Sequence, residues 1–300
     1  MFGFGSSPVS EHEATGEIER VYHEICQTLR VSGVNLNFRT WAGYENLLPV
    51  LWDGLRPNCE TRGFEGFADA LRAHAAQAAL SFSRIDADES IRLGKSQAFQ
   101  LKKSLQLYHF VNPKLLLFTS AVRLALRGEL PSPPSATAND PVPLIPRGIP
   151  GDMYPMVMLE EEPGDPNTRS VFDDIKNTLK LKSINSDYRT LALWPNYLQV
   201  MWAGLKPIVQ TAEYQGAADQ LREHSRSLAM QLPRAVSLTI DDVKAANADP
   251  DKAIETSEAF ERLLPGLIIN IAICLRDYVT DGDLPSSPWP AEAAVALAVP

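Results

Sequence analysis

The chain has 300 residues, 45% of them hydrophobic and 22% charged, which is the composition of a globular protein long enough for two domains. Its 28 basic and 37 acidic residues give a net charge of −9 without a basic cluster, so we expect neither nucleic acid nor a membrane surface as a partner. Three scattered cysteines without CxxC or metal-ligand spacing, no secretory signal and no long apolar run predict a cytoplasmic protein that spans no membrane.

The first half of the chain has the apolar periodicity of helices and lacks the alternation of strands. After a loose lead-in, the pattern predicts helices over residues 17–32, 40–55 and 61–81. Two further helical runs are expected between Leu101 and Leu126, with an interruption at Asn112 and Pro113. Proline is tolerated in the first turn of a helix, so Asn112 is expected at a helix cap or entry loop.

Residues 131–166 differ from the helical segments in composition. Ten of these 36 positions are proline, and helical periodicity is almost absent. The segment therefore predicts an extended linker over the surface. It divides the chain into a first helical repeat, residues 1–130, and a second helical repeat, residues 167–300.

The helical pattern restarts after the linker as a copy of the first half. Residues 21–74 and 171–224 align without a gap and are identical at 22 of 54 positions. A repeat of this length indicates a duplicated unit. The expected fold is therefore all-α, with two homologous helical repeats that form an internal pseudo-dimer and hold a ligand site in the cleft between them.

Residues that the two repeats share are expected to be structural, and a single active site is expected where the repeats differ. The sequence contains no dinucleotide, phosphate-loop, nucleophile-elbow or zinc motif. His74 and its equivalent His224 are therefore assigned to packing, as are Trp52 and Trp202.

The clearest difference between the repeats lies just before an aromatic-Arg-Thr sequence that starts a helix. Asp187 stands where the first repeat has Asn37, and Ser186 stands where it has Leu36. An aspartate at this place is also a common helix N-cap, and spacing alone favours the cap over a catalytic role.

Three other residues also mark a difference between the repeats. Glu65 is matched by Gln215, and Asn112 has no clear counterpart. Thr61 lies one helical turn before Glu65, so the two share a face of the same helix. A solvated helix face is an equally good interpretation for Glu65.

The duplicated helical layout, the Ser-Asp-Tyr-Arg-Thr sequence from Ser186 and the Asn-Pro-Lys-Leu-Leu-Leu sequence from Asn112 resemble the group I D,L-2-haloacid dehalogenases over nearly the whole chain. This resemblance implies that Asp187 is a base that activates water, which attacks C2 of a 2-haloalkanoate and displaces halide with inversion. It also implies that Asn112 holds the water and that Ser186 contacts the substrate. Neither a cofactor nor a metal ion is expected.

The resemblance implies further substrate contacts. A threonine and a glutamate four residues apart are implicated in that family, and Thr61 and Glu65 have this spacing. Val34, Leu36 and Asn37 occupy the region of the pocket wall, where the family would have a tryptophan.

The residue types suit the implied reaction. A carboxylate with an ordinary pKa near 3.9 is ionised at neutral pH and can take a proton from water. Backbone N–H groups at the start of the helix after Asp187 are expected to bind the substrate carboxylate.

The resemblance thus implies a cofactor-independent hydrolase that acts on both enantiomers of short 2-haloacids, and the chain could form a homodimer. In one alternative, Asp187 attacks carbon directly and forms an ester. In another, the chain is an inactive protein that binds or senses a small acid on the same scaffold. A redox enzyme of the AhpD-like helical group would need a CxxC sequence, which this chain lacks.

Overall fold

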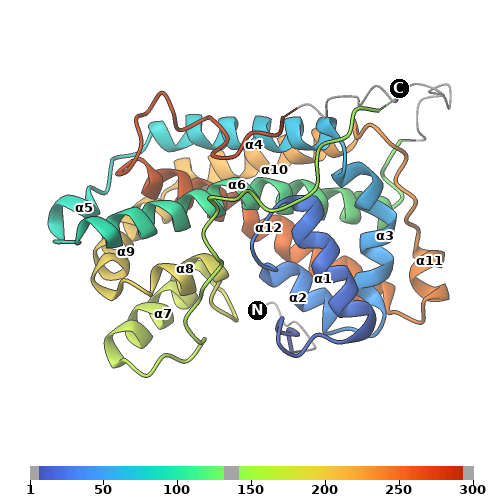
Figure 1. Ribbon diagram of the computed structural model, residues 1–300, viewed down its shortest axis with the longest axis horizontal. Helices are drawn as coiled ribbons and strands as arrows, with labels where there is room; N and C mark the ends of the chain where they lie inside the picture. The colour runs from blue at the N-terminus through green and yellow to red at the C-terminus, as the bar shows by residue number, and fades with distance from the viewer. Residues whose placement is uncertain (1–6, 132–141, 293–300) are drawn as a thin grey trace.

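The computed structural model describes residues 7–131 and 142–292, which form helices joined by loops (Figure 1). Within these residues the one β pairing outside helices is an isolated bridge between Thr61 and Leu144, so the predicted all-α class is confirmed. None of the described helices is apolar over a length that could cross a bilayer. The helices are α1 Gly16–Leu29, α2 Leu36–Ala42, α3 Leu47–Cys59, α4 Arg62–Leu80, α5 Ala87–Ser90, α6 Lys95–Leu126, α7 Pro166–Leu179, α8 Ser186–Leu191, α9 Pro195–Val209, α10 Ala212–Ala229, α11 Ile240–Ala245 and α12 Pro250–Leu275.

The helices of the two halves correspond in pairs, as the duplication predicts. Figure 1 shows α1–α3 and α7–α9 on opposite sides of the long helices α4, α6, α10 and α12, which pack against one another in the middle. The equivalent residues His74 of α4 and His224 of α10 meet there, with 2.8 Å between their Nδ1 atoms. A contact between a residue and its own counterpart marks a pseudo-twofold axis, and the internal pseudo-dimer is confirmed.

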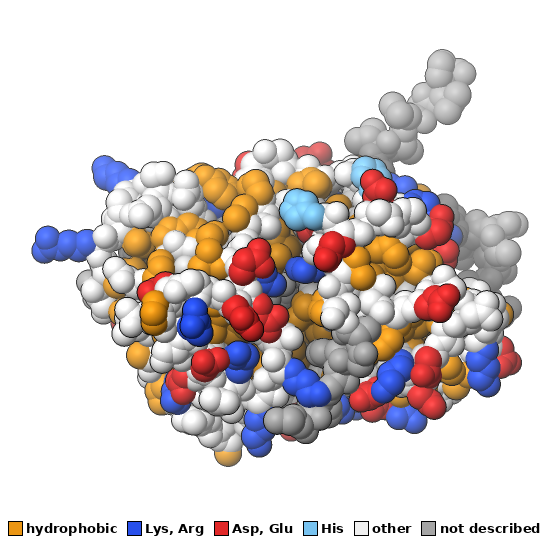
Figure 2. Space-filling model, turned by 90° about the horizontal axis from the view of Figure 1, so that it is seen from below, with side chains coloured by type: hydrophobic (Ala, Val, Ile, Leu, Met, Phe, Trp, Pro, Cys, Tyr) orange, Lys and Arg blue, Asp and Glu red, His pale blue; other side chains and the backbone are white. Residues whose placement is uncertain are grey.

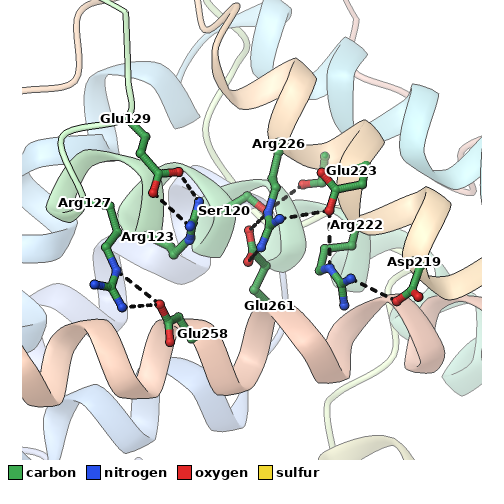
Figure 3. A network of polar contacts seen from close by, with 11 residues as sticks. Ser120, Arg123, Arg127, Glu129, Asp219, Arg222, Glu223, Arg226, Glu258 and Glu261 are labelled. Atoms are coloured by element: carbon green, nitrogen blue, oxygen red, sulfur yellow. Dashed lines mark hydrogen bonds and ion pairs between the residues drawn. The ribbon is translucent and has the colours of Figure 1, made fainter.

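Ion pairs join the long helices, one of them within the second repeat and another between the repeats (Figure 3). Arg226 of α10 donates from Nε to Glu261 of α12 at 3.0 Å. Arg127, which follows α6, donates from Nη2 to Glu258 of α12 at 2.6 Å. Glu261 is buried, and a buried carboxylate is tolerated only when a cation or several donors accompany it. Arg226 therefore stabilises the packing of α10 on α12 more than the exposed pair of Arg127 and Glu258 stabilises the contact between the repeats.

Pro113 does not interrupt a helix, so the expected break at this point is wrong. α6 is continuous over Lys95–Leu126 with Pro113 in its interior. Proline lacks the N–H that would bond to the carbonyl four residues earlier, which is that of His109. Arg72 of α4 donates from Nε to this carbonyl at 2.9 Å and so replaces the missing bond. Asn112 is consequently a mid-helix residue whose side chain can reach another element.

The helix expected over residues 40–55 is divided in two. α2 ends at Ala42, and α3 begins after Asn46, which has φ of 54°. A residue in the left-handed region cannot continue a right-handed helix, so the chain turns here. Pro57 lies inside α3 and does not end it.

The described part of the predicted linker contains no helix between residues 142 and 165. The backbone N–H of Ile145 bonds to the carbonyl of Glu60, and that of Leu159 bonds to the carbonyl of Arg189. The segment therefore passes from the first repeat to the second. Residues 132–141 of the predicted linker lie outside the described residues.

Candidate functional site

The first residues of α2 and α8 meet the middle of α6 and α12 around one small cavity. Its volume is about 20 Å³, slightly more than the ~10–15 Å³ that one water molecule requires. The lining residues of the first repeat are Asn35, Leu36, Asn37, Asn112 and Leu115, and those of the second are Asn185, Ser186, Asp187, Phe260, Leu264 and Leu267. The cavity therefore lies between the repeats, where the sequence predicts the ligand site.

The two sets of lining residues are counterparts of each other. Residues 35–37 correspond to residues 185–187. When the prolines inside α6 and α12 are aligned, Asn112 corresponds to Leu264. The cavity therefore lies at the pseudo-twofold axis with chemically different halves. The second repeat contributes Ser186 and Asp187 where the first has an apolar and an amide side chain, and α6 contributes an amide where α12 has leucine.

Asp187 carries the one carboxylate among the residues that line this cavity. Its side chain is buried, and Oδ1 accepts a hydrogen bond from Nδ2 of Asn112 at 2.7 Å. Burial raises the pKa of Asp187 to about 6, against the lowering effect of the Asn112 hydrogen bond. The pKa is thus higher than the ordinary value expected from the sequence. Most of the group is still ionised at pH 7, since that lies above the pKa.

Asp187 is not the cap of its helix. The N-cap of α8 is Asn185, and Asp187 is the second helical residue. Hydrogen bonds from the long helices hold α8 in place. The Tyr108 hydroxyl of α6 donates to the carbonyl of Ser186 at 3.1 Å, and Asn270 of α12 donates to the Tyr188 hydroxyl at 2.9 Å. Because both neighbours of Asp187 are fixed, its carboxylate has a defined position at the cavity.

Asn37 is a buried polar residue at the cavity whose side chain the described part of the fold leaves without a partner. Its side chain is 2% exposed, and neither Nδ2 nor Oδ1 has a hydrogen-bond partner among the described residues. Buried amides nearly always have partners, and an orphaned one costs about 1–3 kcal/mol. A ligand in the cavity that accepts from Nδ2 would remove this cost. Leu36 adds an apolar wall beside it, and Ser186 adds a hydroxyl from the other repeat.

Three predicted substrate-binding residues, Val34, Thr61 and Glu65, do not line the cavity. Val34 belongs to the hydrophobic core. Thr61 is the N-cap of α4, where its hydroxyl accepts the N–H of Phe64 at 3.1 Å. Glu65 is buried against Lys114 of α6, with 2.7 Å between Oε2 and Nζ. The alternative of a solvated face for Glu65 is therefore wrong.

Sequence reasoning missed several lining residues, namely Asn35, Leu115, Asn185, Phe260, Leu264 and Leu267. Aligning the prolines of α6 and α12 would have pointed to the helix residues among them. A second, larger cavity of about 550 Å³ adjoins the first and shares four lining residues with it. Within residues 7–131 and 142–292, no group of three or more His, Cys, Asp or Glu side chains could hold a metal ion.

Comparison with known proteins shows the family of the chain. The model of the family described as "Halocarboxylic acid dehydrogenase DehI" matches residues 32–188 and 183–279. An (R)-2-haloacid dehalogenase of Pseudomonas putida is 28% identical over 272 residues, which are 88% of this chain and 90% of the relative. A configuration-inverting 2-haloacid dehalogenase of Pseudomonas sp. (strain 113) is 28% identical over 226 residues, or 73% of this chain and 72% of the relative.

A solved structure has the same fold. It is described as the complex of a D-2-haloacid dehalogenase mutant with D-2-CPA, and it matches with a TM-score of 0.82 at 26% identity. The match covers 93% of this chain and 98% of that chain. The resemblance inferred from the two short motifs is confirmed, and the relatives' names agree with the predicted class of enzyme. The chain belongs to the family described as halocarboxylic acid dehydrogenase DehI.

Proposed function

We propose that this protein hydrolyses short 2-haloalkanoic acids of both configurations to 2-hydroxyalkanoic acids, with inversion at C2 and without a cofactor. The observation that carries the proposal is the buried pair of Asp187 and Asn112, 2.7 Å apart, at a cavity with room for one water molecule. The names of the relatives, which include a configuration-inverting 2-haloacid dehalogenase, support it.

Asp187 acts as the general base in this proposal. It takes a proton from water while the water oxygen forms a bond to C2 and the halide leaves with the electrons of the carbon–halogen bond. The proton then passes to solvent. Base catalysis of this kind contributes about 10² to 10⁴ in rate. Attack from the side opposite the halide requires an ordered water, and holding it in line lowers the entropic part of the barrier.

Asn112 orients both partners of this step. Its Nδ2 donates to Oδ1 of Asp187, which leaves its own carbonyl oxygen to accept a hydrogen from the water. The carboxylate of the substrate would accept from the unpaired Nδ2 of Asn37 and from the hydroxyl of Ser186. Leu36 would pack against its carbon chain. Equivalent segments of the two repeats line the cavity on either side of the pseudo-twofold axis, so they offer similar space to the two enantiomers.

The small cavity accommodates the water, and the substrate needs more room. We place the substrate at the junction with the 550 Å³ cavity, where Leu36, Asn185, Phe260 and Leu267 line both spaces. Val34, Thr61 and Glu65 support the walls in this proposal and do not contact the substrate.

The decisive measurement is halide release from D- and L-2-chloropropionate by the wild type and by Asp187→Asn. We expect the wild type to convert both enantiomers to lactate of inverted configuration and the variant to lose nearly all activity. If Asp187→Asn kept its activity while Glu65→Gln lost it, Asp187 would not be the base.

A single turnover in heavy-oxygen water separates direct water attack from an ester intermediate. Direct attack places the label in the hydroxy acid during the first turnover. If the label entered the carboxylate of Asp187 first, the ester mechanism would be correct and the direct one wrong.

A further inference from the structure

The 550 Å³ cavity is an open groove of the second repeat with an unusual charge. It lies between the loop before α8 and the helices α10 and α12. Its lining contains three cations, Lys180, Lys182 and Arg262, and no aspartate or glutamate. Over the face drawn in Figure 2, acidic and basic side chains are interspersed, and the whole chain has a net charge of −9. The groove is therefore a local positive region on an acidic protein.

The corresponding place in the first repeat is filled by side chains. The alignment of the repeats pairs Lys114 with Gly266 of the groove, and Glu65 with Gln215. Lys114 is fully buried, with Nζ 2.7 Å from Oε2 of Glu65 and 2.9 Å from the carbonyl oxygen of Leu29. Its ammonium also lies 3.7 Å from the centre of the Phe110 ring. This ion pair closes the first repeat at the place where the second repeat is open.

Two residues keep the second repeat open. Gly266 has no side chain, and a Cβ there would lie 2.8 Å from the Tyr214 hydroxyl. Gln215 is exposed, and its amide nitrogen donates to the carbonyl of Val209 at 2.9 Å. The replacement of a lysine by glycine and of its partner glutamate by glutamine therefore removes the whole ion pair from this side.

We propose that this groove is the entrance through which the anionic substrate reaches the buried cavity, and that the ion pair of Lys114 and Glu65 closes the equivalent route in the first repeat. The proposal rests on the proposed function, since it takes the substrate to be a 2-haloalkanoate. Lys180, Lys182 and Arg262 attract the carboxylate to the groove. Leu36, Asn185, Phe260 and Leu267 form the inner end, where the two spaces meet.

Charge reversal tests the role of the cations. At low ionic strength, Lys182→Glu should lower kcat/KM for 2-chloropropionate by about tenfold, because anions are steered less strongly to the groove. Added salt should reduce the difference from the wild type, since exposed charges are screened. Lys244→Glu, on exposed α11, changes the net charge equally and should keep the kcat/KM of the wild type. Equal effects of the two variants would overturn the role of the groove cations.

A reversible block tests the route itself. Ala218 of α10 lines the groove, and Gln220 is exposed two residues further on the same helix, where a side chain points away from it. A bulky disulfide-forming reagent should abolish halide release by Ala218→Cys, and a reducing agent should restore it. The same treatment of Gln220→Cys and of the wild type should change activity little.

The outcomes separate the entrance from the proposed function. Full activity of the labelled Ala218→Cys protein would overturn the entrance and leave the function standing. A wild type that releases no halide from either enantiomer would overturn the function and, with it, this inference.

Discussion

Asp187 should reduce the stability of the folded protein at neutral and alkaline pH. Burial raises its pKa from 3.8 to about 6 on folding. A group with a raised pKa contributes stability that is fully present below the unfolded value and is lost as the pH rises through the folded value. A shift of about 2 units, at about 1.4 kcal/mol per unit, corresponds to about 3 kcal/mol above pH 7.

Asp187→Asn isolates this cost, because it replaces the carboxylate by a neutral amide of similar shape. The carbonyl oxygen of the new side chain can still accept the hydrogen bond from Asn112. The variant should exceed the wild type in free energy of unfolding by about 3 kcal/mol at pH 8.5 and by about 1 kcal/mol at pH 4.5. For a chain of this size, 3 kcal/mol corresponds to a rise in Tm of about 5 °C.

Denaturant unfolding of both proteins across this pH range measures the difference directly. Asp241→Asn is the control, since the Asp241 side chain is almost fully exposed and should show no such pH dependence. The variant should also lack halide release at every pH. If its stability advantage failed to grow with pH, the reasoning that Asp187 is a desolvated carboxylate would be refuted.

Three further predictions follow from the same contacts. In the wild type, kcat/KM should rise with pH as Asp187 loses its proton, with a midpoint near its pKa of about 6. Asn112→Leu removes a hydrogen bond that lowers this pKa. The midpoint of the pH–rate profile should therefore move to higher pH, and the rate should fall about tenfold or more. Asn37→Asp places a second carboxylate at the cavity and should also raise the apparent pKa of Asp187 in a pH–rate profile, because like charges disfavour ionisation. The appearance of a second, independent active site would contradict this prediction. Lys114→Met removes the nearer of two cations beside buried Glu65 and leaves Arg30, 3.6 Å from Oε1. It should cost about 3 kcal/mol in denaturant unfolding, and the double variant that adds Glu65→Gln should recover part of the loss.

The local errors of sequence reading have a common physical origin. Pro113 predicts a helix boundary because the backbone loses a hydrogen bond to the carbonyl of His109. In the folded protein, Arg72 of another helix donates to this carbonyl instead. Thr61 is the N-cap of α4, and Glu65 lies in its first turn, where Lys114 of α6 is its partner. In both cases the deciding side chain, Arg72 or Lys114, lies on another helix and is distant in the sequence.

The sequence by itself determined the duplication, the all-α class and the place where the repeats differ chemically. These follow from identical residues at a constant spacing, which can be read from the sequence without any knowledge of the packing. The contrast of Asp187 with Asn37 was visible for the same reason, and it identified the candidate base.

Only the tertiary structure decided what surrounds that base. Asn112 reaches Asp187 because α6 passes through Pro113 unbroken and crosses the start of α8. The raised pKa of Asp187 likewise depends on burial by helices far away in sequence. The open groove beside Gly266 and the closed one at Lys114 differ by contacts across several helices. Desolvation and access are properties of the assembled core, so a single stretch of sequence cannot specify them.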